Sequence, residues 1–285
     1  MRKSVSLLLL TAMLCAALAG CAESDGGGGK LRFKEVAGGV ALYRYKGSSK
    51  ETAFTVPDEH NGLPVVEIMD FALANAEYLT SVAIGRNIKI IGDWAFTNSL
   101  KLTAFEVPPE NSAFTQRGGI LYTKDMSELV ACPNGKTPLT LDDGKKVTGG
   151  AEVIVPATVK KIRNNAFYIC ENLYTIKFND GLEAIGDKAF IKCVNLQNFT
   201  LPGTLKTIGV DAFSYCDSLT KLTIPASVTA IGDYAFFSLA SGITEIVIER
   251  ENADGLKLGK DWVPNKKDTI ENKVEVKFLT PEYKA

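Results

Sequence analysis

Apolar residues recur along the chain in a short phrase, of which IGDKAF at residues 185–190 is one copy. The phrase begins with an isoleucine, here called the anchor. The anchors are Ile68, Ile91, Ile162, Ile185, Ile208 and Ile231, and the differences 91−68, 185−162, 208−185 and 231−208 all equal 23. A period of this length predicts a solenoid, because one repeat cannot bury its apolar side alone and must stack on its neighbours.

Each repeat predicts the same short elements. Apolar residues stand eleven, fourteen and sixteen positions after an anchor, and the last spacing of two is typical of a strand with one buried face. A second extended piece ends at the anchor, and a helical turn carries the Ala-Phe pair that follows it, as in Ala189-Phe190. We expect a right-handed β/α superhelix of about 23-residue coils. Its strands are parallel, its helical turns are short, and caps close both ends.

Asp or Asn stands two residues after most anchors, at Asp70, Asp93, Asn164, Asp187 and Asp233. This column could form a carboxylate ladder for calcium, but a calcium site needs several oxygen ligands for each ion. Because Asp and Asn interchange just before the helical turn, the pattern favours an N-cap for that turn. Gly follows four of the anchors, but Met69 and Arg163 occupy the same column, so a phosphate-binding loop is not indicated.

Three cysteines, Cys170, Cys193 and Cys216, share one position of the repeat and should stack about 5 Å apart. A disulfide between stacked coils would need distorted geometry. A three-thiolate metal site has no histidine or fourth cysteine to complete it, because Cys132 lies outside the repeats. We therefore expect a buried column of small apolar thiols and no metal.

The period breaks between Ile91 and Ile162, where two apolar runs flank a polar turn at residues 124–127. This pattern predicts a hairpin insertion at about 111–135 within repeats that span 57–250. Residues 31–56 alternate apolar and polar positions around glycines, as in an N-terminal cap hairpin. Residues 251–285 suggest a short turn and a closing strand, which form a C-terminal cap.

The repeat can be written LxxLxIPxxVxxIGxxAFxxCxxL, and it resembles the BspA-like family of bacterial leucine-rich repeat proteins. The resemblance covers most of the mature chain. It includes the insertion, because members of the family often carry a similar GILY…LV.CP segment. The resemblance implies a surface lipoprotein, like those of Bacteroidetes, that takes part in adhesion and in contact with a host or with other bacteria.

The start of the chain predicts export. Residues 1–20 have a basic start and an apolar run too short to span a bilayer, as in a signal peptide. The segment LAGC at residues 18–21 resembles the lipobox of bacterial lipoproteins, which implies cleavage before Cys21 and acylation of that residue. Residues 21–30 continue as a polar, Gly-rich tether. Ala22 in place of Asp resembles enterobacterial sequences that are not retained in the inner membrane, and Glu23 and Asp25 resemble the acidic export signals of Bacteroidetes lipoproteins. These resemblances imply an outer-membrane lipoprotein exposed at the cell surface.

Composition and charge exclude several functions. The chain is 46% hydrophobic and 23% charged, as expected of a globular protein, and its formal net charge of −1 gives no basis for nucleic-acid binding. The only histidine, His60, lies in a turn-rich stretch, which removes most histidine-based catalysis and most zinc sites. Spacing singles out no nucleophile with its base and no acid pair. We expect neither an enzyme nor a cofactor.

Outward positions of the first strand in each repeat should align into a polar face. The candidate binding residues are Thr80, Thr103, Tyr174, Lys177, Gln197, Asn198, Thr220, Lys221 and Glu245. With Tyr174 as its only aromatic residue, this face fits a protein partner, such as a host-matrix protein or another cell surface, better than a glycan. The threonines also have a second explanation that involves no partner, because exposed strand positions favour threonine. The alternatives are a carbohydrate-capturing accessory lipoprotein and a purely structural envelope protein.

Overall fold

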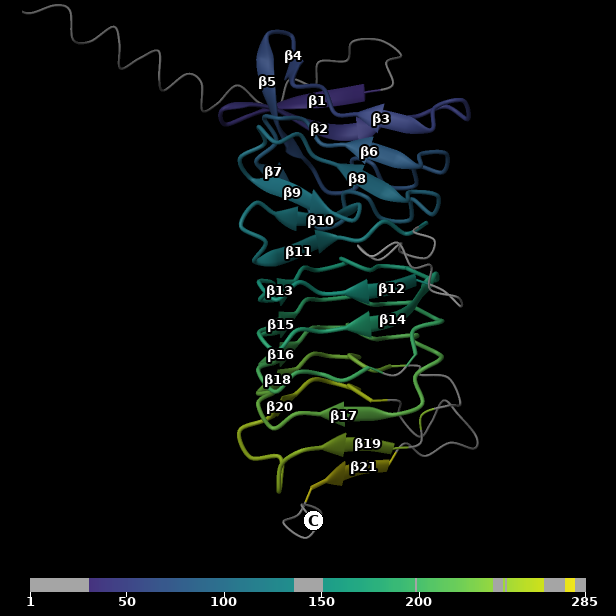
Figure 1. Ribbon diagram of the computed structural model, residues 1–285, viewed down its shortest axis with the longest axis vertical. Coiled ribbons are helices and arrows are strands. Elements are labelled where there is room, and N and C mark those ends of the chain that lie inside the picture. Colours follow the sequence, from purple (N-terminus) through teal and green to yellow (C-terminus); the bar gives the residue numbers. More distant parts are fainter. Residues whose placement is uncertain are drawn as a thin grey trace, which may run out of the picture.

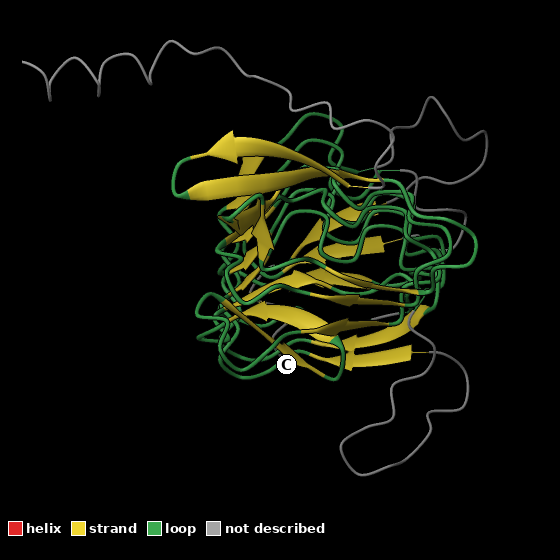
Figure 2. Ribbon diagram, turned by 90° about the horizontal axis from the view of Figure 1, so that it is seen from above, coloured by secondary structure: helices red, strands yellow, loops and turns green. Residues whose placement is uncertain are grey.

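The computed structural model describes residues 31–135, 151–197, 199–237, 243, 245–263 and 275–279. The expected signal peptide, Cys21 and the tether lie outside these residues. Figure 1 shows the described chain as one elongated stack of coils, and Figure 2 looks along that stack, so that the coils lie over one another. No helix among the described residues is long and apolar enough to cross a membrane.

Most strands lie in two columns that run the length of the stack (Figure 1). The anchor column contains β5 (Leu63–Ile68), β7 (Ile90–Ile91), β11 (Glu128–Ala131), β13 (Lys161–Ile162), β15 (Ala184–Ile185), β16 (Thr207–Ile208), β18 (Ala230–Ile231) and β20 (Lys257–Leu258). The face column contains β3 (Ala53–Thr55), β6 (Ser81–Ala83), β8 (Ala104–Glu106), β12 (Ala151–Ile154), β14 (Leu173–Lys177), β17 (Leu222–Ile224), β19 (Glu245–Ile248) and β21 (Glu275–Phe278). The remaining strands are β1 (Leu31–Val36), β2 (Gly39–Tyr45), β4 (Glu59–His60), β9 (Phe114–Arg117) and β10 (Ile120–Thr123).

The predicted register of the anchors is confirmed. Ile162, Ile185, Ile208 and Ile231 pair in sequence along parallel strands, and Ile68 pairs with Ile91 in the same way. Inside the stack, the side chains of Phe167, Phe190, Phe213 and Phe236 lie over one another with ring centroids 4.7, 5.0 and 5.4 Å apart. The apolar column that the sequence placed inside is therefore the core of the solenoid.

The predicted helical turns are wrong for the described residues, which contain turns but no helix at these positions. In the coil after Ile185, Lys188 and Lys192 adopt left-handed backbone conformations, with φ of 55° and 59°. These two residues turn alternate N–H groups toward the next coil, so that Lys188 N–H donates to the Val210 carbonyl at 2.8 Å and Phe190 N–H to the Ala212 carbonyl at 2.8 Å. A helix would satisfy these groups locally, whereas the turn uses them to join coils.

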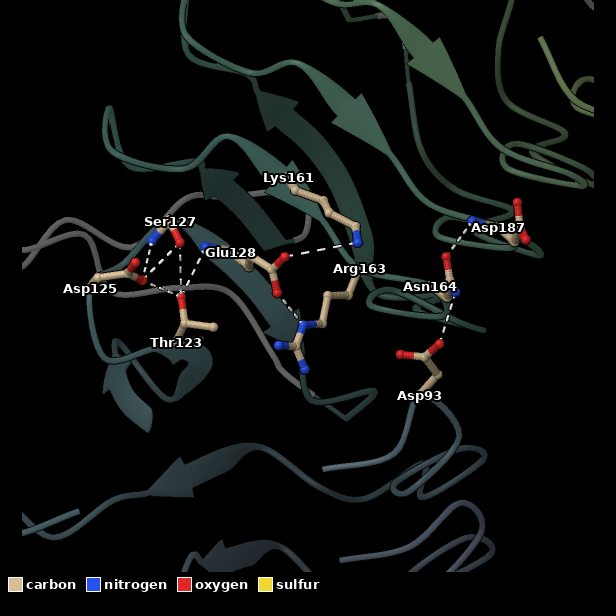
Figure 3. A network of polar contacts seen from close by, with 9 residues as sticks. All are labelled: Asp93, Thr123, Asp125, Ser127, Glu128, Lys161, Arg163, Asn164 and Asp187. Carbon is tan, nitrogen blue, oxygen red and sulfur yellow. Dashed lines mark hydrogen bonds and ion pairs between the residues drawn. The ribbon is translucent and has the colours of Figure 1, made fainter. Parts of the chain in front are cut away.

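The aspartate column also joins coils and does not cap helices, which corrects the N-cap prediction. Asn164 Oδ1 accepts a hydrogen bond from the Asp187 N–H at 2.8 Å, and Asp187 Oδ1 accepts one from the Val210 N–H at 2.8 Å. Asp233 Oδ1 accepts from the Lys260 N–H at 2.7 Å. Asp and Asn interchange because each offers one acceptor oxygen to the backbone of the following coil. Figure 3 shows Asp93, Asn164 and Asp187 in this line.

The predicted hairpin is confirmed, and its second strand forms a rung of the solenoid. Strands β10 and β11 pair antiparallel about the turn at 124–127, and β9 adds a third strand that the sequence did not reveal. Leu129 of β11 pairs in parallel with Ile162 and occupies an anchor position. The Glu128 side chain forms ion pairs with Arg163 and with Lys161, the latter at 3.8 Å (Figure 3).

This hairpin also divides the hydrophobic core. Ile120, Tyr122 and Leu129 belong to the cluster that continues toward the C-terminus. Leu121 and Val130 belong to the cluster that continues toward the N-terminus. Because neighbouring residues of a strand point to opposite sides, one hairpin closes both cores.

At the N-terminal end, β1 and β2 form the predicted antiparallel hairpin, and β2 pairs in parallel with β5. The face column begins with β3 at residues 53–55, which pairs in parallel with β6, so the first coil starts within the segment expected to be the cap. At the other end, β21 pairs in parallel with β19, as expected of a closing strand. The predicted turn before β21 lies largely outside the described residues.

The cysteine column is buried as predicted, but it has four members. Cys193 Sγ donates to the Phe167 carbonyl and Cys216 Sγ to the Phe190 carbonyl, each at 3.1 Å. Cys132, which was expected outside the column, lies beside Cys170, whose Sγ is 3.9 Å from the Cys132 carbonyl oxygen. All four thiols are free, and no group of three His, Cys, Asp or Glu residues within the described ranges could hold a metal ion.

These thiols should be unreactive in the folded protein. Burial raises the pKa of the Cys193 and Cys216 thiols, and the pKa of Cys170 is raised by its contact with Cys132 and by burial. Because the thiolate is the reactive form, an aromatic disulfide reagent should label close to none of the four thiols in native protein of residues 22–285, and all four after denaturation. Rapid labelling of all four under native conditions would contradict the buried column.

Candidate binding surface

The predicted binding residues lie on the outer side of the face column, here called the strand face. Thr80, Lys177, Gln197, Thr220 and Lys221 are exposed, and Thr103, Tyr174 and Glu245 are partly exposed. Asn198 lies outside the described residues. The alternation within β17 and β19 explains this placement, because Leu222, Ile224, Ile246 and Ile248 point inward and leave their neighbours outside.

The strand face is interrupted, whereas the sequence predicted aligned, continuous columns. Three separate sheets make up the face column, namely β3-β6-β8, β12-β14 and β17-β19-β21. Among the described residues between β14 and β17, no strand of the face column is assigned, although the Gln197 N–H donates to the Tyr174 carbonyl at 2.9 Å. The structure therefore brings Tyr174 and Gln197 together. Thr80 and Thr103 lie elsewhere, directly before strands β6 and β8 of a separate sheet.

The threonines of the first sheet have a role within the fold. Thr80 Oγ1 donates to the Thr52 carbonyl and Thr103 Oγ1 to the Thr80 carbonyl, each at 2.9 Å. These hydroxyls satisfy carbonyl groups of the preceding coil where the strands begin. The preference for Thr at this position thus follows in part from coil stacking.

Charged residues on the C-terminal sheets neutralise one another. The ammonium of Lys177 lies 2.7 Å from a carboxylate oxygen of Glu152 on the neighbouring strand β12. Lys277 of β21 contacts Glu245 of β19, and lies 3.4 Å from Glu275. The face is consequently polar without a strong field of either sign, which suits a broad surface contact better than capture of a highly charged ligand.

The strand face is hollowed at its N-terminal sheet, where a pocket has a volume of about 390 Å³. Thr55, Ala83 and Glu106 line it from neighbouring strands, and Asp58 and Arg86 close one side with an ion pair of 2.7 Å. This pair is not evident from the sequence, because Asp58 stands 28 residues before its partner. The residues that line the hollow include no nucleophile beside a base. We therefore treat the hollow as part of the shape of the binding surface.

The polar network in Figure 3 is likewise structural. Asp125 Oδ1 accepts hydrogen bonds from the Ser127 N–H at 3.0 Å and from the Thr123 hydroxyl at 2.7 Å. These bonds lower the pKa of Asp125 to about 2, because they stabilise the ionised carboxylate. The adjacent Met126 has a φ of 59°, as the hairpin turn requires. The cluster holds a turn in shape and offers no general base.

Taken together, the in-register parallel strands and the stacked aromatic core define a leucine-rich-repeat solenoid. The model of the BspA type leucine rich repeat region matches residues 43–118 and 148–254 with six copies. The chain therefore belongs to the BspA-type leucine-rich repeat family. The match omits residues 119–147, which include β10 and β11. Leucine-rich repeat proteins are typically non-enzymatic scaffolds that bind protein partners.

Several solved structures of bacterial repeat proteins are similar to the chain. The pneumococcal vaccine antigen PcpA is 17% identical, with 89% of this chain and 87% of that chain covered and a TM-score of 0.49. A leucine-rich cell surface protein from Faecalibacterium prausnitzii is 16% identical, with 85% and 95% covered and a TM-score of 0.49. A leucine-rich repeat protein from Bacteroides ovatus is 17% identical, with 90% and 76% covered and a TM-score of 0.47. None of the curated proteins compared with the chain matches it.

Proposed function

We propose that the mature chain is a lipid-anchored, non-enzymatic interaction protein of the outer membrane, exposed at the cell surface. It binds a protein partner, on a host or on another cell, through the strand face. The observation that carries this proposal is the face itself, on which Tyr174, Gln197 and Thr220 occupy the same position of successive coils and, with Lys221, are exposed or partly exposed. Family membership supports the interaction role, and the LAGC segment supports the anchor.

A matched pair of substitutions tests the binding face. Thr220 is an exposed threonine on the strand face, and Thr207 is an exposed threonine on the outer side of the anchor column. The protein of residues 22–285 should bind at least one of a panel of immobilised extracellular-matrix proteins. Thr220→Arg should weaken that binding at least tenfold, because it places a long charged side chain in the contact. Thr207→Arg should leave it unchanged.

The carbohydrate alternative predicts a different outcome. If the protein binds a glycan array and not the matrix proteins, and if Tyr174→Ala abolishes that binding, then the strand face recognises sugar and the proposal is wrong. Loss of matrix binding in Thr207→Arg alone would place the contact on the anchor column. Absence of binding to both panels would favour the structural envelope role.

The anchor is tested separately. Cys21→Ser should release the folded protein from the membrane fraction into the soluble fraction, because the acylated side chain is lost. Retention in the membrane would argue against lipidation of Cys21. Labelling of intact cells with an impermeant biotin reagent should modify the wild-type protein, and protection until lysis would refute exposure at the cell surface.

A further inference from the structure

Exposed and partly exposed aromatic side chains gather along one edge of the solenoid, away from the strand face. This turn edge consists of the residues two to seven positions after each anchor. Phe71 stacks on Trp94 with ring centroids 5.6 Å apart, and Trp94 meets Tyr168 edge to face at 5.4 Å. Further along the stack, Tyr215 and Tyr234 contact Phe237 at 6.0 and 5.6 Å. Aromatic contacts of this kind reach from the coil of Ile68 to that of Ile231.

Ring faces on this edge already bind ammonium groups. The Lys188 ammonium lies 5.4 Å from the centroid of Trp94, and the Lys192 ammonium lies 6.0 Å from the centroid of Tyr215. Both lysines come from one turn between the two aromatic groups. Cation–π attraction at such distances shows the chemistry that this edge offers to a further cation.

The backbone conformation disfavours aromatic residues at three of these positions. Phe71, Tyr215 and Tyr234 adopt left-handed backbone conformations, with φ of 61°, 60° and 56°. This conformation is costly for a bulky residue, and Asn tolerates it better, as at the equivalent positions Asn98 and Asn165. Phe71 is also 59% exposed and Tyr215 38% exposed. An aromatic residue with a left-handed backbone and a ring exposed to solvent is unfavourable for stability in both respects. Such a residue points to a role in binding.

The charge of the turn edge indicates the partner. Five carboxylates lie there, at Asp70, Asp93, Asp187, Asp211 and Asp233, against two ammonium groups, at Lys188 and Lys192. The edge is thus more acidic than the whole chain, which has a formal charge of −1. Asp70, Asp93, Asp187 and Asp233 are exposed beside the aromatic rings. Acidic groups next to exposed and partly exposed aromatic rings complement lysine and arginine side chains.

We propose that the turn edge is a second docking surface, which binds a lysine- and arginine-rich segment of a partner protein. The segment lies along the stack, with its cationic side chains over the exposed rings and beside the aspartates. This contact is independent of the strand face, so the two surfaces are tested separately.

Tryptophan fluorescence provides a direct test, because Trp94 and Trp262 are the only tryptophans of the chain. Trp262 packs edge to face on Phe236 at the C-terminal end, so Trp262→Phe keeps an aromatic ring and leaves Trp94 as the only reporter. Titration of this variant of residues 22–285 with decalysine at low salt should give a saturable change in emission. Phe71→Asn in the same background should weaken the apparent affinity at least tenfold, while Thr207→Arg should not change it.

The probes also separate the other occupants. A saturable response to dextran, or to vesicles of phosphatidylcholine and phosphatidylglycerol, in place of decalysine would overturn the proposal in favour of a sugar or a lipid surface. If Phe71→Asn binds decalysine with the same affinity as the Trp262→Phe parent, then the binding is a non-specific attraction between opposite charges. This result would also contradict the proposal. No response to decalysine would also overturn it.

The same variant distinguishes a binding role from a structural one. Because Asn suits the left-handed conformation better than Phe, Phe71→Asn should melt at the wild-type temperature or above it while it loses decalysine binding. A clear fall in melting temperature would mean that the Phe71 ring serves the fold, and the argument from strain would fail.

Discussion

Truncation of Phe190 to Ala should lower the free energy of unfolding by about 3–5 kcal/mol. Phe190 is fully buried, and its ring lies between Phe167 and Phe213 with centroid distances of 4.7 and 5.0 Å. The edge of the Phe178 ring adds a third contact at 5.9 Å. The backbone of each coil is hydrogen-bonded to its neighbours, so the stack cannot collapse into the cavity that the substitution leaves.

Phe71→Ala supplies the matched control, since it removes the same atoms from a ring that is 59% exposed. It should change stability by less than about 1 kcal/mol, as is usual for surface substitutions. Urea unfolding followed by circular dichroism measures both variants. Equal and small losses for the two substitutions would mean that the Phe column does not form the core.

Replacement of Gly209 by Ala should also destabilise the protein, by about 1–3 kcal/mol. A Cβ atom at this position would lie 2.5 Å from the backbone nitrogen of Asp187 and 2.5 Å from its Oδ1. Because Asp187 Oδ1 also accepts the hydrogen bond of the Val210 N–H, the neighbouring coil cannot move away without losing that bond. Close approach between coils, and not a positive φ, explains this glycine column.

Gly203→Ala is the control for this prediction, because no atom lies within 4 Å of the Cβ position and the backbone φ is not in the left-handed region. It should be neutral or slightly stabilising. Thermal unfolding of the two alanine variants measures the difference. A Gly209→Ala variant as stable as Gly203→Ala would show that the coils are not packed as closely as described.

The two exceptions in the glycine column follow from the same contact. Met69 follows the anchor whose neighbour is Leu42 of β2, and Arg163 follows the anchor whose neighbour is Leu129 of β11. In both places the preceding rung is a hairpin strand that continues past the anchor position, to Tyr45 in β2 and to Ala131 in β11. The backbone of the preceding turn comes close to Gly209 and also to Gly232, where a Cβ atom would lie 2.4 Å from the Val210 backbone nitrogen, so the repeat demands glycine there.

The sequence predicted the parts of the fold that depend on apolar periodicity. The anchor register, the Phe column and the hairpin about residues 124–127 follow from which residues must be buried. The turns could not be predicted in this way, because their N–H groups bond to the next coil, more than twenty residues away. The sequence does not show which carbonyl of the next coil accepts these hydrogen bonds. Without that information, a local pattern of Asp, Ala and Phe favours a capped helical turn.

The candidate surface was predictable to a smaller extent. Alternation in the strands placed Thr220 and Lys221 outside, but it could not show that Lys177 pairs with Glu152 or that the face column is interrupted after β14. The aromatic turn edge was missed for a related reason. Phe71, Trp94 and Tyr234 stand three residues after their anchors, but the other coils carry Asn165, Lys188 and Asp211 there, so the column shows no common property in the sequence.

The most direct test of a surface protein that acts through its strand face is the adhesion of whole cells. Cells that produce wild-type protein, Thr220→Arg or Thr207→Arg at equal surface amounts are compared with a deletion strain on the matrix protein bound in vitro. The account predicts that Thr220→Arg cells adhere no better than the deletion strain and that Thr207→Arg cells adhere like wild type. Adhesion of Thr220→Arg cells at the wild-type level would contradict it.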